Sequence, residues 1–575
     1  MSYMNFSTAN CKNCYKCLRS CPVKAIKFKN EQAEIAEDRC IACSHCLVIC
    51  PQNAREIVSD LEKVKIAISS GKRVIATIAP SFAGFFDMNP GKFVSLLKKF
   101  GFSSVEETAL GADLVSNLYK NYIEQNFSSN YITTACPSAN YLVEKYYPSL
   151  IKYLIPVVSP MVAHGKILRD VYGEDSFIVF IGPCLGKKVE SESFSNKGAI
   201  DAVLTFEEIY EWIEENAIEI DKLEDTNFDK NSFIGGRGYA LSGGIVDTVK
   251  NTLDEKSLEV ISVSGTEECI ELLESIKNGE IENAFIEMSI CRGSCIGGPG
   301  MVKNENRYFK KSLRVRKYMK NARDSMDNEQ IYSGEWNFKN FARQFIDKSI
   351  SKLDVSESEL DMIMKEMGKH SKEDELNCGV CGYNTCIEKA KAIYEGMAES
   401  TMCLHYMRSK AENLRNVIFE NTINCMILLD ENMNVVDINP AVERAFMIRR
   451  ENIIDKPISL LMDDKDFKNI VEDRSKIINK KISCPSYNLE FVANAVYLKE
   501  QNIVVIAMVN ITEEEKSKKE LMKLKENTLN AAQEVIDKQM MVAQEIASLL
   551  GETTAETKIT LTKLKKIVEG ENGII

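Results

Sequence analysis

The 575-residue sequence lacks the features that mark nucleic-acid-binding and membrane proteins. Its 84 acidic residues outnumber 72 basic ones and give a formal net charge of −12, so no basic surface for nucleic acid is expected. No apolar run approaches the roughly 18 residues of a membrane-spanning helix, and the longest, Ile503 to Val509, predicts a buried strand. The start of the sequence shows no basic-then-apolar signal segment. We therefore expect a cytoplasmic protein with no membrane or nucleic-acid partner.

Histidine is scarce. The chain has four histidines, His45, His164, His370 and His405. The tail from Glu513 onward therefore contains no histidine that could accept a phosphoryl group, and it leaves no room for an ATPase domain. These absences exclude a histidine kinase.

Cysteine, by contrast, is abundant. Nineteen cysteines in a chain without an export signal favour metal ligation over disulfide bonds. The length is that of about three to five domains. Most of the cysteines fall into three groups, and the remaining Cys269, Cys425 and Cys484 are expected to be small buried side chains.

The first group has the doubled spacing of bacterial two-cluster ferredoxins, with Pro22 and Pro51 after the fourth cysteine of each run. In this pattern the fourth cysteine of each run binds the other cluster. The predicted 4Fe–4S ligands are Cys11, Cys14, Cys17 and Cys50 for one cluster and Cys40, Cys43, Cys46 and Cys21 for the other. A pair of zinc sites is the alternative, because zinc also takes four thiolates. We expect residues 1–60 to form this module and to transfer electrons.

The central region, residues 70–350, alternates apolar runs with helical patterns, which predicts an α/β architecture with its site on loops. The runs Val74–Ala79, Phe177–Ile181 and Ala284–Ile286 predict buried strands. The second group of cysteines lies in three segments: Thr134-Ala135-Cys136-Pro137, Pro183-Cys184-Leu185-Gly186-Lys187-Lys188, and Glu287-Met288-Ser289-Ile290-Cys291-Arg292-Gly293-Ser294-Cys295-Ile296-Gly297-Gly298. In this order they resemble the three signature loops of the iron-only (di-iron) hydrogenases.

This resemblance implies an H-cluster, in which a 4Fe–4S cube is bridged through one thiolate to a di-iron unit carrying CO, cyanide and a dithiolate. By the same resemblance, Cys295 would bridge the two parts, and Lys187 would donate a charge-assisted hydrogen bond to a cyanide ligand. The implied ligands of the cube are Cys136, Cys184, Cys291 and Cys295.

Several neighbours of these residues also match the family's loops. Glu190 matches an acidic residue and is expected to have a weaker, structural role. Lys188 is expected to be a solvated surface lysine. The glycines that should let the backbone pass close to the cluster are Gly297, Gly298 and Gly300.

The chain departs from the active hydrogenases where that family moves protons. A cysteine that passes protons to the dithiolate is replaced by Ala135, which carries no exchangeable proton. After Ala112-Asp113-Leu114, the positions of the relay glutamates hold Tyr119 and Tyr122, and a tyrosine with a pKa near 10 is a poor relay. The methionines that flank the di-iron unit are replaced by Gly182 and Ser289. Known sensory di-iron hydrogenases show the same losses.

A third group of cysteines follows a polar linker, Ser349 to Lys372. Its spacing resembles the small four-cysteine module of several redox proteins, and we expect residues 372–408 to hold a third 4Fe–4S cluster, with structural zinc as the alternative. A helix rich in Ala and Glu is expected to deliver the fourth cysteine. The predicted ligands are Cys378, Cys381, Cys386 and Cys403.

Residues 411–512 resemble a PAS domain. Met426–Leu429 and Val435–Ile438 predict a β-hairpin, and Asn439 followed by Pro440 predicts a helix start. Two later strands, Tyr487–Leu498 and Ile503–Val509, are expected to pair across a turn. No residue stands out as a haem or flavin ligand, so a PAS domain that transmits a signal without a ligand is expected.

Residues 513–570 predict a charged helical tail for signalling and dimerisation, similar to the helix that follows many PAS domains. Apolar or small residues recur at spacings near three and four, with Gln539 interrupting, which is typical of a dimer seam. One helix docked on its own protomer is the alternative. The stripe consists of Leu521, Leu524, Thr528, Ala532, Val535, Val542, Ile546 and Leu549.

Three functional hypotheses remain open from the sequence. The first is a low-turnover hydrogenase-type H2 sensor that signals to a separate effector, with a ferredoxin-like protein as a further electron partner. The second is a slow ferredoxin-linked hydrogenase with a regulatory PAS domain. The third is an iron–sulfur redox or oxygen sensor without a di-iron centre. The retained cysteines and Lys187 argue against the third, whereas Ala135 and Tyr119 argue against the second.

Overall fold

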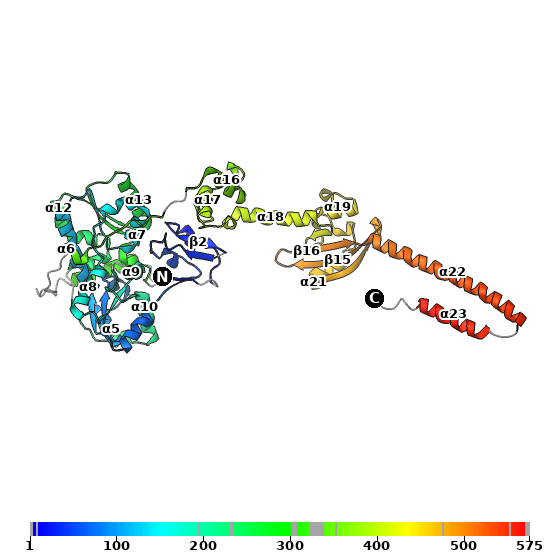
Figure 1. The fold of residues 1–575 in the computed structure, drawn as a ribbon, viewed down its shortest axis with the longest axis horizontal. Coiled ribbons are helices and arrows are strands. Elements are labelled where there is room, and N and C mark those ends of the chain that lie inside the picture. The colour runs from blue at the N-terminus through cyan, green and yellow to red at the C-terminus, as the bar shows by residue number, and fades with distance from the viewer. Residues whose placement is uncertain are drawn as a thin grey trace. The chain divides into compact units, whose positions relative to one another are not determined.

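The computed structural model describes residues 4–6, 10–30, 32–193, 196–230, 234–301, 307–321, 338–350, 354–473, 476–550 and 554–569. The chain divides into two compact units, Met1–Met407 and Arg408–Ile575, and Figure 1 draws the elements of each. Within the described ranges, no helix is both long enough and apolar enough to cross a membrane.

The N-terminal module is built from short elements between the cysteines. Strands β1 (Met4–Phe6) and β4 (Arg55–Ile57) pair antiparallel, as do β2 (Ile26–Lys29) and β3 (Gln32–Ile35). Each cysteine run ends in one helical turn, α1 (Lys16–Arg19) or α2 (His45–Val48). Such short elements leave most of this backbone in loops, where the thiols project.

The central domain contains a four-stranded, all-parallel sheet in the order β6-β5-β8-β9. Its strands are β5 (Val74–Ile78), β6 (Ser104–Glu107), β8 (Phe177–Gly182) and β9 (Ala202–Thr205). All are buried, as expected for a parallel sheet covered on both faces. The helices around it are α3 (Leu61–Ser69), α4 (Phe82–Phe85), α5 (Pro90–Phe100), α6 (Ala109–Gln125), α8 (Pro160–Tyr172) and α10 (Phe206–Glu215).

A second parallel sheet, in the order β10-β11-β7, forms another lobe of the central domain. Its strands are β7 (Asn130–Ile132), β10 (Glu259–Ser264) and β11 (Ala284–Ser289). The predicted strands at 74–79, 177–181 and 284–286 are thus confirmed, but the third lies in a different sheet from the other two. Helices α7 (Pro137–Tyr146), α12 (Gly244–Glu255) and α13 (Thr266–Lys277) contact this sheet. The other helices of the central domain are α9 (Gly186–Glu192), α11 (Ile234–Arg237), α14 (Tyr308–Asn321) and α15 (Phe338–Phe341).

The four-cysteine module packs on the N-terminal module. It contains α16 (Glu357–Glu366) and α17 (Cys386–Tyr394), and α17 ends well before Cys403, which follows a short 3-10 turn, Ser400–Met402. Glu395 forms an ion pair with Arg39 at 2.7 Å. Gly382, at φ 97°, lies so close to Leu18 that an added Cβ would be 2.7 Å from that side chain. These contacts hold the four-cysteine module against the ferredoxin-like part.

The second unit contains a five-stranded antiparallel sheet in the order β13-β12-β16-β15-β14. The predicted hairpin is confirmed as β12 (Cys425–Leu429) and β13 (Val435–Ile438), and Asn439 caps α19 (Pro440–Phe446) by accepting from the Val442 amide. Strands β15 (Leu489–Leu498) and β16 (Ile503–Asn510) pair as expected. The charged strand β14 (Lys476–Cys484) was missed by the sequence reasoning, because its Lys residues hide the alternation of apolar positions. Helices α20 (Arg450–Ile453) and α21 (Lys465–Asp473) complete the domain.

Three long helices flank this sheet in sequence. Helix α18 (Leu404–Asn421) precedes it, and α22 (Thr512–Leu550) and α23 (Thr554–Glu569) follow it (Figure 1). The apolar stripe predicted in the tail lies on α22, where Leu521, Leu524 and Val535 are each more than half exposed. The side chain of Leu549 lies outside what the structure describes.

Candidate metal-cluster site

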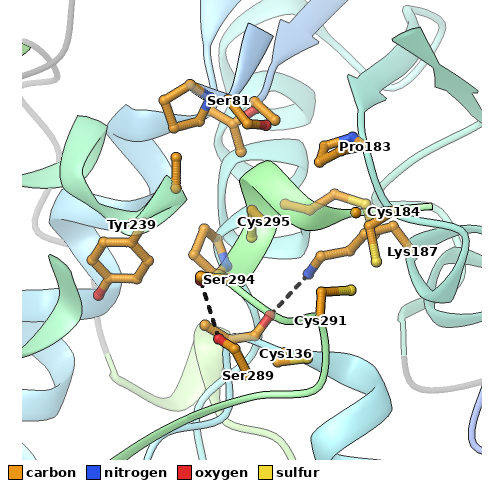
Figure 2. Close-up of a pocket in the computed structure, with 18 of the residues that line it drawn as sticks. Ser81, Cys136, Pro183, Cys184, Lys187, Tyr239, Ser289, Cys291, Ser294 and Cys295 are labelled. Atoms are coloured by element: carbon orange, nitrogen blue, oxygen red, sulfur yellow. Dashed lines mark hydrogen bonds between the residues drawn. The ribbon is translucent and has the colours of Figure 1, made fainter. Parts of the chain in front are cut away.

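The three cysteine-bearing loops meet at one cavity, which Figure 2 shows. Cys136 follows β7 and precedes α7, whose first residue is Pro137. Cys184 lies between β8 and α9, and Cys291 follows β11. The loops thus leave the carboxyl ends of strands from both sheets, the usual position for a ligand site in α/β proteins. The four cysteines that line the cavity are Cys136, Cys184, Cys291 and Cys295.

Glycine allows the second and third loops to approach each other closely. A Cβ on Gly298 would lie 2.6 Å from the Pro183 carbonyl oxygen, and one on Gly300 would lie 2.9 Å from the Thr205 side chain. The Gly300 amide donates to the same Pro183 carbonyl at 2.9 Å. These glycines therefore hold the loop of Cys295 against the loop of Cys184.

The cavity strongly disfavours free thiolates. Burial raises the pKa of the Cys184 thiol to about 12 and that of Cys295 to about 11, and it raises the pKa of Cys291 well above its usual value. The positive charge of Lys187 lowers the pKa of both Cys184 and Cys295. Cys295 exposes its surface to the cavity, while protein surrounds the cavity itself. Four thiols in such a place suit a metal cluster, whose irons stabilise the thiolate form.

A further polar atom faces the same space. The Ser81 hydroxyl is fully buried on the cavity wall, and among the described residues it has no hydrogen-bond partner. An unpaired buried hydroxyl costs free energy unless a bound group satisfies it. The donor set therefore fits a cluster that also carries polar ligands. Sequence reasoning missed Ser81, although its place directly after the β5 strand was a usable signal.

Lys187 is held at the cavity by a buried ion-pair network. Its Nζ donates to the Ala135 carbonyl at 3.2 Å and to Glu190 Oε2 at 2.7 Å (Figure 2 draws the former). Glu190, completely buried, also accepts from Ser159 at 2.9 Å and pairs with Arg343 at 3.0 Å. Glu190 thus orients the lysine, and Arg343 is a partner that the sequence did not reveal because it lies 153 residues away.

The expectation that Lys188 is a solvated surface lysine is wrong. Lys188 is 5% exposed and lies within ion-pair distance of Glu208, at 3.4 Å, and Asp60, at 3.7 Å. The two adjacent lysines of α9 thus have different buried partners. The ammonium group of Lys187 pairs with the Glu190 carboxylate, and that of Lys188 pairs with the Glu208 carboxylate.

The residues at the family's relay positions carry no obvious proton route. Ala135 contributes to the cavity wall. Tyr119 is fully buried, and burial raises its pKa to about 12. Its hydroxyl bonds with Thr134, whose own hydroxyl donates to the Val157 carbonyl at 2.8 Å, and a carbonyl has no proton to pass on. Burial also raises the pKa of Tyr122, which is half-buried.

Gly182 and Ser289 occupy the positions of the two absent methionines. A Cβ on Gly182 would lie 2.6 Å from the Phe180 ring, so this position has no room for a larger side chain. Ser289 lines the cavity, and its hydroxyl bonds with that of Ser294 at 3.2 Å (Figure 2). Of these two positions, only Ser289 contributes to the cavity wall, and it contributes a small polar group.

Cys21 lies close to the cysteines of the second run, although it belongs to the first run. Burial raises the pKa of Cys46 to about 12, and charge repulsion from Cys40, Cys21 and Cys17 adds to this effect. Charge repulsion from Cys21, Cys46 and Cys40 acts on Cys43 in the same direction. Cys21, the fourth cysteine of the first run, thus lies among the cysteines of the second run.

The cysteine groups also lie near one another. Cys43 and Cys291 line one surface pocket, so the N-terminal module reaches the wall behind the cavity. Cys17, Cys21 and Cys381 pack against one hydrophobic cluster between the N-terminal and four-cysteine modules. The cysteines of the third group, Cys378, Cys381, Cys386 and Cys403, line a pocket with Lys389.

The remaining cysteines are ordinary core residues. Cys269, Cys425 and Cys484 are 0%, 3% and 1% exposed, which confirms the expectation that they are small buried side chains. In the part of the chain that the structure describes, no group of three or more His, Cys, Asp or Glu side chains is placed to hold a single metal ion.

Comparison with protein families identifies four segments. The C-terminal domain of the iron-only hydrogenase large chain matches residues 72–299, and a 4Fe-4S dicluster domain matches residues 3–51. A putative Fe-S cluster family matches residues 374–405, and the PAS fold matches residues 413–488. The chain is an iron-only hydrogenase-like protein with a PAS domain. Iron–sulfur binding and a mixed α/β fold follow from these matches.

Individual relatives fall into two classes. Iron hydrogenase 1 of Clostridium pasteurianum is 26% identical over 362 residues, which cover 50% of this chain and 63% of that protein. Cytosolic iron-sulfur assembly component 3 of Rattus norvegicus is 22% identical over 352 residues, covering 48% of this chain and 73% of that protein. A solved [FeFe]-hydrogenase of Chlamydomonas reinhardtii aligns with 51% of this chain and 100% of its own, at 15% identity and a TM-score of 0.39. The relatives that this chain resembles thus include an iron hydrogenase and an iron–sulfur assembly protein.

Proposed function

We propose that this chain is an H2 sensor that binds and slowly oxidises H2 at an H-cluster and reports the result through its iron–sulfur clusters, PAS domain and tail to a separate effector. One combination of features supports this proposal most: all four predicted ligand cysteines line one cavity, whereas Ala135 and Tyr119 offer no proton route. Proton transfer by a positioned side chain is worth about 10²–10⁴ in rate. Slow turnover at a complete site suits detection better than bulk oxidation.

The chain's own residues would bind and orient the cofactor. The four cavity cysteines would hold the cube, with Cys295 as the bridging ligand, and Lys187 and Ser81 would donate to polar ligands. When bound, an H-cluster supplies reversible splitting of H2 into two protons and two electrons. The Glu190 network would keep Lys187 aimed at the cavity, because Glu190 fixes the position of its ammonium group.

Electrons from H2 would leave through the neighbouring cysteine groups. The shared pocket of Cys43 and Cys291 favours transfer into the N-terminal clusters, and the shared apolar contact of Cys21 and Cys381 favours onward transfer to the four-cysteine cluster. Helix α18 begins at the residue after Cys403 and continues to Asn421, just before the PAS strands. A change at the third cluster would therefore act directly on the end of a helix that leads into the PAS domain. A ferredoxin-like protein is the proposed external electron partner.

Infrared spectroscopy of anaerobically purified, artificially matured protein tests the proposal. We expect CO and cyanide bands that shift on exposure to H2, together with slow turnover of an artificial electron acceptor. Cys425→Ser is the matched control, since this buried cysteine lies in strand β12 of the second unit and should leave the bands unchanged. Fast turnover would indicate an efficient enzyme and would contradict the sensor. Absence of the bands with the other clusters loaded would leave an iron–sulfur redox or oxygen sensor without a di-iron centre.

Signal output would use a homodimer formed through the PAS domain and the α22 stripe. Leu524 is 64% exposed and Val535 is 56% exposed, so a second copy could cover them. Leu524→Glu should weaken the dimer by about tenfold or more, whereas Lys525→Glu, on a neighbouring position, should not. Sedimentation across a concentration series measures this effect, and equal dimer affinities for the two variants would favour a tail docked on its own protomer.

A further inference from the structure

A chain of hydrogen bonds begins at the cavity wall and runs away from the cysteines. Thr108, which lines the cavity, shares a 2.7 Å hydrogen bond between its hydroxyl and that of Thr77. The Thr77 hydroxyl also lies 2.8 Å from Nδ1 of His164. All three side chains are buried: Thr77 and His164 are 0% exposed, and Thr108 is 5% exposed.

The chain continues from His164 to the surface. Nε2 of His164 lies 3.3 Å from Oε2 of Glu106, which is also completely buried. The Tyr172 hydroxyl donates to Oε1 of Glu106 at 2.6 Å and lies 3.0 Å from the Ser104 hydroxyl. Tyr172 is the last residue of α8 and is only half-buried, and the exposed Arg73 guanidinium lies over its ring. The outer end of the chain therefore reaches solvent.

The placement of these groups is unusual for packing alone. Thr108 stands at the N-cap position of α6, where a threonine ordinarily accepts from a backbone amide, but it makes no capping bond. Thr77 is the one polar residue of the fully buried strand β5. A buried histidine and carboxylate need partners in any fold. A histidine–carboxylate pair with a purely structural role would need no hydrogen bonds leading to the cavity or to the surface. The His164–Glu106 pair has both.

Every member of the chain is able to accept and donate a proton. Hydroxyls do both, neutral imidazole accepts at one nitrogen while it donates at the other, and a carboxylate accepts and then releases. By contrast, the Tyr119 hydroxyl leads to Thr134 and from there to backbone carbonyls, where proton transfer stops. A proton route thus ends beyond Tyr119, whereas Tyr172 is hydrogen-bonded to a carboxylate through which a proton can pass.

We propose that the chain Thr108–Thr77–His164–Glu106–Tyr172 carries protons between the cavity and solvent, in place of the route interrupted at Ala135 and Tyr119. This inference rests on the proposed function, in which each H2 releases two protons into the cavity. For each proton that leaves, an acceptor in the cavity transfers a proton to the Thr108 hydroxyl. The hydroxyls of Thr108 and Thr77 then pass a proton to Nδ1 of His164, and Nε2 of the same imidazole releases a proton to Glu106. The carboxyl group then gives it up at the Tyr172 end, so one proton enters and one leaves. A threonine hydroxyl is a far weaker acid than a thiol, which keeps this route slow.

The test is the rate at which the CO and cyanide bands of the full, matured chain respond to H2, measured in H2O and in D2O. Thr77→Val removes one hydroxyl at nearly constant shape and should slow the response by about 10²-fold, while the bands themselves stay at their native positions. Thr77→Ser restores a hydroxyl and should restore the rate and its solvent isotope effect. Tyr119→Phe is the matched control and should respond as the unaltered chain does. Far-ultraviolet circular dichroism and iron content verify that each variant is folded and loaded.

The outcomes separate this proposal from the function on which it rests. If Thr77→Val and His164→Gln both keep native bands and respond at the unaltered rate, the proton route is wrong and the sensor proposal stands. If the bands of the unaltered chain never respond to H2, the sensor proposal fails. In that case the proton route is tested by the rate at which the same bands respond to chemical reduction. Equal rates in Thr77→Val and the unaltered protein would overturn the proton route. Absence of all bands overturns both proposals.

Discussion

The cysteines on the cavity wall and the path that leads from Ala135 through Thr134 to the buried Tyr119 differ in their chemistry. The loops bring together four thiols and Lys187, held by a buried network of charges. The Ala135–Tyr119 region offers a methyl group and a tyrosine whose pKa burial raises to about 12. The chain thus retains the groups that could bind a cluster, but it lacks the groups that could move protons quickly. From this difference we expect cluster binding and turnover to be separable at this cavity.

The largest expected effect comes from removing one proposed ligand. Cys291→Ala should abolish the CO and cyanide bands completely, because the cube would lose one of its four thiolates. Infrared spectroscopy and iron analysis of the matured protein measure this loss.

Cys386→Ala provides the matched control in another cysteine group. It should remove only the third cluster, so iron content falls while the bands persist. Native bands in Cys291→Ala would show that the cavity cysteines do not hold the cube.

The second prediction restores the proton-moving groups. Ala135→Cys combined with Tyr119→Glu should raise turnover by about 10²–10⁴-fold, because a thiol and a carboxyl group would replace groups that do not relay protons. Turnover of matured protein with an artificial electron carrier measures the gain. Ala135→Ser with Tyr119→Glu is the control, since a hydroxyl is a much weaker acid than a thiol. An unchanged rate in the cysteine variant, with native infrared bands, would place the limit on turnover elsewhere.

The sequence was most informative where chemistry depends on local spacing. The cysteine runs and the three apolar strands follow from neighbouring residues; the structure contains the three strands and brings Cys136, Cys184, Cys291 and Cys295 to one cavity. Contacts between distant positions could not be read in the same way: Arg343 meets Glu190 across 153 residues, and Thr77 meets His164 across 87. Lys188 was misjudged because a lysine's charge gives no indication of the buried carboxylate that Glu208 supplies.

The third prediction concerns the network behind Lys187. Arg343→Met should lower the free energy of unfolding of the central domain by about 3 kcal/mol, because it leaves the buried Glu190 without one of its cationic partners. Denaturation followed by tryptophan fluorescence measures this change, since Trp212 packs on Phe100 within the same domain.

Lys65→Met is the control for a more exposed ion pair. Lys65 pairs with Glu215 at 3.0 Å, but these side chains are 29% and 57% exposed, so the loss should be below about 1 kcal/mol. Equal destabilisation by Arg343→Met and Lys65→Met would mean that burial adds nothing to the Glu190 network.

The smallest expected effect tests whether Ser81 belongs with the binding groups or with the proton-moving groups. Its hydroxyl faces the cavity without a partner among the described residues, so a polar ligand of a bound cluster should accept its hydrogen bond. Ser81→Ala should then shift the infrared bands while turnover stays within about threefold, since one hydrogen bond contributes about 0.5–1.5 kcal/mol and would act alike before and after reaction. Ser138→Ala is the control, because that hydroxyl already donates to the Ala42 carbonyl at 3.2 Å and should leave the bands in place. A large loss of turnover in Ser81→Ala without a band shift would instead assign Ser81 to proton transfer, and the separation of binding from turnover at this cavity would no longer hold.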